Sequence, residues 1–112
     1  MEKTKKEDAL IFKMLDLSTA HLQKSTMDAL HGITHRHPSY LKMASEQSWP
    51  IVFDKDDYGY FIHISEDPWD LDDERIPKDL RDIMKYASAL GCHWINLDRD
   101  GTIMEELTIY EW

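Results

Sequence analysis

Apolar and polar residues alternate near the start of the chain, which is the pattern of a β-strand with one buried face. Leu15 and Leu17 lie on one side of this alternation, and Asp16 and Ser18 lie on the other. We therefore expect a first strand over residues 12–18.

Two short helices are predicted next. Ser25 and Asp28 lie three residues apart, as in a capping box. Three apolar residues follow at helical spacing. These apolar residues are Met27, Leu30 and Ile33. The first helix is expected over 26–33, and a second over 38–44, where Pro38 suits a first helical turn.

A hairpin signature follows the helices. The apolar run 51–53 is separated by a polar segment from the β-branched and aromatic run 58–65. Residues of the second run alternate between two partly covered faces, which places this strand inside a sheet. One face carries Tyr58, Tyr60, Ile62 and Ile64, and the other carries Gly59, Phe61 and His63.

The clearest helix in the chain follows the loop 66–75. Pro77 opens it, apolar residues recur at steps of three and four, and Gly91 is placed to end it. The apolar residues are Leu80, Ile83, Met84, Ala87 and Leu90. A strand over 93–97, a turn at 99–101, and one or two short strands over 102–110 complete the pattern.

This order, β-α-β-β-α-β-β with a short extra helix, predicts an α+β fold. We expect a single domain over residues 10–112, preceded by a polar N-terminal tail over 1–9. About five strands should form an antiparallel or mixed sheet, with two main helices on one face. A chain of 112 residues is long enough for one hydrophobic core without disulfides or metal.

Charge is distributed unevenly along the chain. Residues 1–50 carry seven basic and six acidic residues, whereas residues 51–112 carry six basic and sixteen acidic, for a total of −9. An acidic chain is repelled by phosphate backbones and favours a basic protein partner. We expect no direct nucleic-acid binding, no membrane association and no cofactor, and a homodimer is compatible with the composition.

The acidic residues concentrate between positions 54 and 74. This segment, here called the acidic stretch, has nine acidic residues against one lysine, a net charge of −8 in 21 residues. With an aromatic anchor at Trp69, it is predicted to bind a basic partner. The predicted partner-binding residues are Asp54, Asp56, Asp57, Glu66, Asp67, Trp69, Asp70, Asp72, Asp73 and Glu74. The alternative interpretation is a solubilising surface with Trp69 packed locally.

Three further motifs have residue types that can carry chemistry. The segment from Asp98 to Thr102 spells the DxDGT signature of haloacid-dehalogenase-type phosphatases and the start of a calcium loop, but its surroundings favour a turn. His31, His35 and His37 have spacings that suit a metal, yet they lack a carboxylate or cysteine partner. Cys92 is expected to be a small buried hydrophobe. We predict no catalytic residue and no metal site.

Five segments carry a family resemblance. They are Leu17-Ser18-Thr19-Ala20-His21, Tyr58-Gly59-Tyr60-Phe61, Ile76-Pro77-Lys78-Asp79-Leu80, the region 87–100 around Gly91-Cys92-His93-Trp94-Ile95, and Tyr110-Glu111-Trp112. Together they resemble an uncharacterised family of small accessory proteins encoded by phages, prophages and plasmids. The resemblance implies a mobile-element protein in the bacterial cytoplasm. It leaves open whether the segment 17–21 is a shared site or a capped strand end.

These observations favour a non-enzymatic binding protein that inhibits a host defence or nucleic-acid-binding protein with a DNA-mimic-like surface, as anti-CRISPR and anti-restriction proteins do. The alternative is an immunity or antitoxin protein that neutralises a cationic toxin. A third hypothesis is a small hydrolase that uses Asp98 and Asp100.

The acidic stretch yields a first test. The combined substitutions Trp69→Ala, Asp70→Lys and Asp72→Lys should abolish partner binding and leave the thermal midpoint nearly unchanged. Surface substitutions usually change stability by about ±0.5 kcal/mol, whereas removal of a buried Trp costs roughly 3–5 kcal/mol. Thermal unfolding with a binding assay separates the two roles, and a large drop in midpoint would assign Trp69 to the core.

Overall fold

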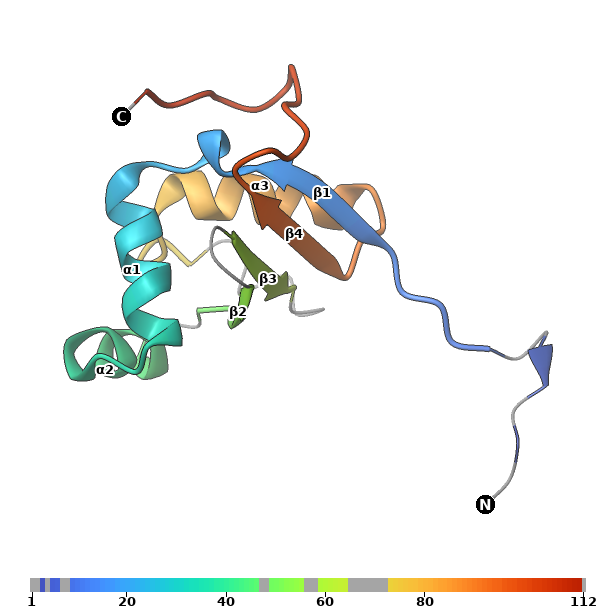
Figure 1. Ribbon diagram of the computed structural model, residues 1–112, viewed down its shortest axis with the longest axis horizontal. Helices are drawn as coiled ribbons and strands as arrows, with labels where there is room; N and C mark the ends of the chain where they lie inside the picture. Colours follow the sequence, from blue (N-terminus) through green and yellow to red (C-terminus); the bar gives the residue numbers. More distant parts are fainter. Residues whose placement is uncertain are drawn as a thin grey trace.

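Four strands form one mixed sheet in the order β1-β4-β3-β2 (Figure 1). The computed structural model describes residues 3, 5, 6, 9–46, 49–55, 59–64 and 73–111. The strands are β1 (Met14–Ser18), β2 (Ile51–Lys55), β3 (Gly59–His63) and β4 (Trp94–Asp98). β4 pairs in parallel with β1 and antiparallel with β3, and β3 pairs antiparallel with β2. The expected α+β class and mixed sheet are confirmed.

Three α-helices and one short 3₁₀ turn accompany the sheet. They are η2 (Thr19–His21), α1 (Lys24–Thr34), α2 (Pro38–Glu46) and α3 (Lys78–Ala89). Each α-helix coincides with a predicted segment. In Figure 1, α3 runs behind the sheet, and α1 and α2 lie beside its β2 end.

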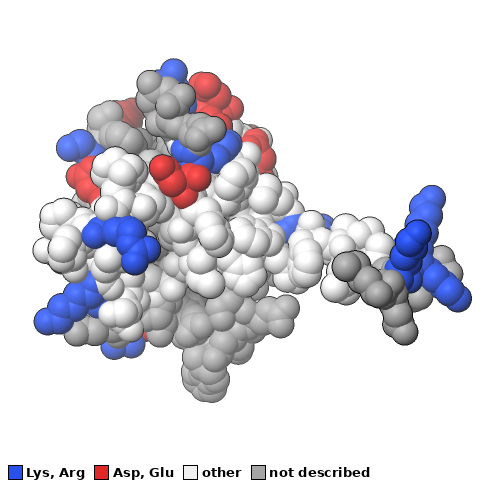
Figure 2. Space-filling model, turned by 60° about the horizontal axis from the view of Figure 1, so that its bottom comes forward, with Lys and Arg blue, Asp and Glu red and all other residues white. Residues whose placement is uncertain are grey.

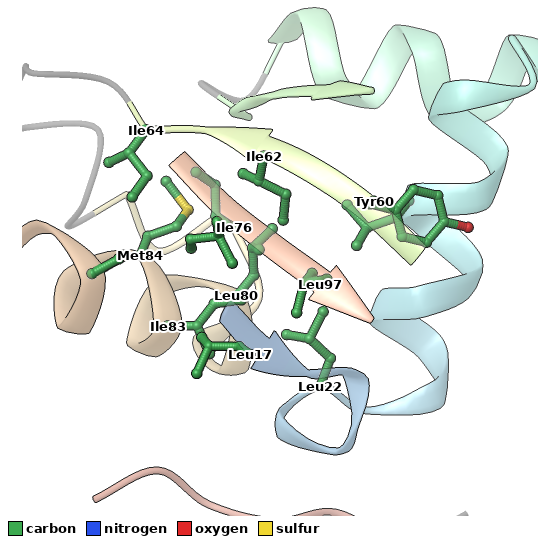
Figure 3. Close-up of a cluster of buried hydrophobic side chains, with 13 residues drawn as sticks. Leu17, Leu22, Tyr60, Ile62, Ile64, Ile76, Leu80, Ile83, Met84 and Leu97 are labelled. Atoms are coloured by element: carbon green, nitrogen blue, oxygen red, sulfur yellow. The ribbon is translucent and has the colours of Figure 1, made fainter. Parts of the chain in front are cut away.

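The hydrophobic core lies on one face of the sheet. Alternate residues of the strands point toward α3 and α1 and are almost fully buried (Figure 3). The strand residues are Leu17, Tyr60, Ile62, Ile95 and Leu97, Ile64 directly follows β3, and the helical residues are Leu30, Leu80, Ile83, Met84 and Ala87. The other strand residues therefore point to the opposite face, which no described helix covers.

Helix α3 begins and ends where its sequence signals predict. Pro77 is its N-cap residue, and its interior buries Leu80, Ile83 and Met84 on one stripe. Gly91 follows the helix with φ 77°, a left-handed conformation that favours glycine. The Lys13 side chain donates a hydrogen bond of 3.0 Å to the carbonyl of Leu90 at this end. The β1 segment is thereby attached to the end of α3.

The N-terminus of α1 is capped by another helix. Its N-cap residue is Gln23, which makes no side-chain cap, so the capping box predicted from Ser25 and Asp28 is wrong. Instead, the buried Asp79 carboxylate of α3 accepts a bond of 2.8 Å from the Gln23 N–H and one of 2.9 Å from the Thr26 hydroxyl. This long-range cap, which spacing within α1 cannot reveal, joins α1 to α3.

Residues 102–111 form no strand, so the prediction of one or two strands over 102–110 is wrong, and the described residues contain four strands rather than about five. Their backbone groups bond instead to η2 and its flanks. The Tyr110 N–H donates to the Ala20 carbonyl at 2.8 Å, and the Ser18 N–H donates to the Thr102 carbonyl at 2.8 Å. The segment crosses the end of the sheet as an irregular strap.

The long-range cap gives a stability prediction. Asp79→Ala leaves the Gln23 N–H and the Thr26 hydroxyl without their charged acceptor and should lower the free energy of unfolding by roughly 3 kcal/mol. The control Asp82→Ala, which removes an exposed ion pair with Lys78 on the same helix, should change it by only about 0.5 kcal/mol. Urea unfolding measures both, and equal losses would contradict the role of Asp79.

Candidate functional site

On the face of the sheet opposite the core, the strand residues form three rows that cross all four strands, and in the third row Ser18 is buried and Gly59 has no side chain. Strand registers place Met14, Trp94, His63 and Ile51 in the first row, Asp16, Asn96, Phe61 and Phe53 in the second, and Ser18, Asp98, Gly59 and Lys55 in the third. We call this surface the open face. Its first row is mainly apolar, and its third is polar.

A shallow, wide-open apolar groove lies on the open face. Met14, Phe53, Phe61 and Trp94 line it, and its volume is about 440 Å³. The Trp94 ring lies 5.9 Å from the Phe53 ring and 4.9 Å from the His63 ring. Met14 and Phe53 remain about half exposed, at 49% and 50%. Trp94, which a strand position would assign to the core, is instead half-buried on this surface.

A polar network occupies the other end of the open face. The Lys55 ammonium donates bonds of 2.8 Å to Asn96 Oδ1 and to Asp98 Oδ2. Gly59 lies between Lys55 and Asp98 in the register, so no side chain obstructs this reach. Asn96 Nδ2 in turn donates to Asp16 Oδ1 at 3.1 Å. Strands β2, β4 and β1 are thus connected through their side chains.

The Asp98 carboxylate of the DxDGT segment belongs to this network. Hydrogen bonding from Lys55, and then from the Asp100 backbone N–H, lowers the pKa of Asp98 below its ordinary value. The Gly101 N–H donates to the Asp98 carbonyl at 3.0 Å, which closes the predicted turn. Thr102 does not bond to Asp98; its hydroxyl donates to Asp16 Oδ2 at 2.8 Å. The segment therefore forms a strand end and a turn, as its surroundings predicted.

Three of the ten predicted partner-binding residues are described by the structure. Asp54 on β2 and Glu74 before α3 are exposed. Asp73 is partly buried, and its two carboxylate oxygens accept bonds from the Arg75 side chain at 3.0 and 2.8 Å. The other predicted residues, Asp56, Asp57, Glu66, Asp67, Trp69, Asp70 and Asp72, lie outside the described residues.

Lys55, the lysine of the acidic stretch, is bonded to Asn96 and Asp98, which lie outside the stretch. Lys55 points to the open face, whereas Asp54 lies on the opposite side of β2, because successive strand residues alternate. Burial raises the pKa of Tyr60 above its ordinary value, and the Asp54 and Asp28 carboxylates raise it further. Lys55 is thus paired with Asp98, and Asp54 contributes a negative field at the edge of the sheet.

On the face shown in Figure 2, uncharged side chains occupy the centre, and acidic and basic groups are interspersed around them. In this view the described acidic side chains do not form one continuous area. The charge pattern of the sequence did not indicate the apolar groove. The alternation of Gly59, Phe61 and His63 was the available signal for a second, partly exposed face.

The segment 17–21 has a structural role. In the segment 17–21, the Ser18 hydroxyl accepts a bond from the Ala20 N–H, which confirms the capping interpretation. His21 is buried; its Nδ1 lies 2.9 Å from the Thr108 carbonyl, and its Nε2 accepts a 3.0 Å bond from the Met104 N–H. This assigns the proton to Nδ1. His21 therefore holds the strap formed by residues 102–111.

The histidine cluster lies at the end of α1. The helix continues through Gly32 and ends at Thr34, so His31 lies in its last turn, and His35 and His37 follow it. The rings of His31 and His35 stack at 3.9 Å, and His35 Nδ1 lies 2.9 Å from the His31 carbonyl. The His35 ring thus bonds to a carbonyl of the last helical turn, which is a structural role. Within the described part of the chain, no three His, Cys, Asp or Glu side chains are placed to hold a metal ion.

The fold and surfaces define a small α+β protein built on a sheet with one covered and one open face. The chain belongs to the family described as "Family of unknown function (DUF5983) C-terminal domain", whose model matches residues 14–112. No curated protein and no solved structure matches it. Among the described helices, none has the length and apolar character to cross a membrane.

The Lys55–Asp98 pair leads to a prediction on pH. Because the folded-state pKa of Asp98 is lowered, its stabilising contribution is present above the unfolded-state pKa and is lost as the pH falls through the folded-state value. Lys55→Met should raise the pKa of Asp98 in a carboxyl ¹³C NMR titration. Lys42→Met, which removes an exposed charge on α2, serves as the control. An unchanged titration of Asp98 in the Lys55 variant would contradict the pairing.

Proposed function

We propose that this chain is a non-enzymatic, acidic binding protein of a mobile genetic element. It inhibits a host defence or nucleic-acid-binding protein by presenting the acidic stretch as a DNA-mimic-like surface, in the manner of anti-CRISPR and anti-restriction proteins. The phage, prophage or plasmid origin and the cytoplasmic location are part of this proposal. They rest on the family resemblance of the sequence.

The observation that carries the proposal is the engagement of Lys55. It is the single basic residue between positions 54 and 74, and its ammonium is bonded to Asp98 and Asn96 on the open face. The pair satisfies a carboxylate outside the stretch, so Lys55 does not offset the charge of the nine acidic residues within it. Among the described ones, Asp73 is paired with Arg75, which directly follows the stretch. Closely spaced carboxylates in large excess over basic groups have a charge density that competes with a phosphate backbone for a basic site.

The geometry of the other candidate groups supports a binding role over catalysis. Both Asp98 oxygens accept hydrogen bonds, from Lys55 and from the Asp100 N–H. Both nitrogens of His21 are committed to the strap. A general base or nucleophile needs a free atom within reach of substrate, and these groups are engaged in holding the fold.

Affinity capture from a bacterial host lysate tests the proposal. Binding to the captured partner should weaken at least about tenfold between 50 and 200 mM salt, because ionic contacts with a basic site are screened. Duplex DNA should displace the chain if the occupied site normally holds nucleic acid. A partner whose binding ignores both salt and DNA would overturn the proposal, and a captured toxin would replace it with the immunity alternative.

Matched charge reversals locate the surface. Asp54→Lys with Glu74→Lys and the control Glu105→Lys with Glu111→Lys change net charge by the same amount, and all four residues are exposed. Only the first pair should reduce affinity strongly, by roughly tenfold or more, because it lies in the acidic stretch. Equal losses in both variants, measured by titration calorimetry, would indicate a nonspecific effect of net charge.

A further inference from the structure

The residues before β1 form an apolar arm that projects from the body (Figure 1). Leu10, Ile11 and Phe12 are 85%, 82% and 60% exposed. Among the described residues, no backbone hydrogen bond joins positions 9–12 to the sheet. The radius of gyration is 14.9 Å, against about 13 Å for a compact chain of this length. Three consecutive apolar residues on such an arm are an unusual exposure for a monomer.

The arm is directed away from its own apolar groove. The Lys13 carbonyl accepts bonds from the N–H groups of His93 and Trp94, at 2.9 and 3.3 Å, and the Lys13 ammonium bonds to Leu90. The Phe12 ring packs edge-on against the His93 ring at 5.3 Å. These contacts hold Phe12 and Lys13 against the start of β4 and the end of α3. The arm leaves the body at this point. A sharp reversal there would be needed for Leu10 and Ile11 to reach the groove of the same copy.

We infer that the chain forms a reciprocal homodimer in which Leu10 and Ile11 of each copy occupy the apolar groove of the other. The groove is lined by Met14, Phe53, Phe61 and Trp94. Arm and groove meet at Met14, so a second copy would cover both exposed apolar surfaces with one repeated contact. In a two-fold arrangement of this kind, each arm is bound by the other copy, so neither arm is left exposed and no third copy is recruited.

The dimensions of the two surfaces agree. Three strand spacings separate β1 from β2, which is about 14 Å. Four extended residues, from Met14 back to Leu10, span about 13 Å. An arm that enters over β1 of the other copy therefore places Leu10 near the β2 edge.

Charge does not oppose this arrangement. Residues 1–9 carry three lysines and three acidic residues, so the outer part of the arm has no net side-chain charge. A foreign segment in the groove would leave Leu10 and Ile11 exposed, whereas a second copy covers both apolar surfaces, and this selects a second copy as the occupant.

Sedimentation equilibrium on the full chain tests the inference. The mass should rise with concentration from 13.3 kDa toward twice that value. Leu10→Ser with Ile11→Ser, and separately Met14→Ser with Phe53→Ser, should each weaken dimerisation at least tenfold. The control Ile103→Ser with Ile109→Ser, two comparably exposed residues on the strap, should leave it unchanged. Circular dichroism verifies that each variant is folded.

Mixing the variants separates arm exchange from other dimers. The groove variant retains its arm and the arm variant retains its groove, so an equimolar mixture should form heterodimers at concentrations where each variant alone is monomeric. A chain that stays monomeric at all concentrations would overturn the inference, as would a dimer that survives loss of the arm residues. Neither result bears on the proposed function, because partner binding is measured through the acidic stretch and its dependence on salt.

Discussion

The two-sided pairing of β4 is the interaction on which the structure depends. β4 bonds in parallel to β1 and antiparallel to β3, and these registers determine which side chains share a face. Ile95 and Leu97 are thereby directed into the core, and Trp94, Asn96 and Asp98 to the open face. A slip of one residue would exchange the two sets, burying a carboxylate and exposing the core leucine. Both the apolar groove and the Lys55 network are consequences of this register.

Local signals predicted most of the secondary structure. The apolar stripe of α3, with Pro77 before it and Gly91 after it, indicated a helix within one or two residues of Lys78–Ala89. The run 58–65 correctly predicted an interior strand. In both segments, the spacing of apolar residues and the local backbone preference indicate the same element of secondary structure. Such an element can be predicted without knowledge of its tertiary contacts.

The features that could not be predicted depend on contacts between residues far apart in the sequence. The cap of α1 comes from Asp79, 56 positions after Gln23. Residues 102–111 have apolar residues suited to a strand, but His21 and Ala20 take up their backbone groups. The Lys55 network required the side-chain positions on three strands. For the candidate site, composition located the acidic stretch, whereas the apolar groove arises from residues on four separate strands.

The parallel pairing of β1 with β4 also determines when the protein can fold. Asp16 and Asn96, neighbours on the open face, are 80 positions apart in the chain. At translation rates of roughly 5–20 residues per second, β1 leaves the ribosome about 4–16 s before its partner strand has been made. During that interval Leu15 and Leu17 have no sheet to join, and nonlocal pairing of this kind is slow in itself. The core and the open face can therefore form only once β4 is available to pair with both β1 and β3.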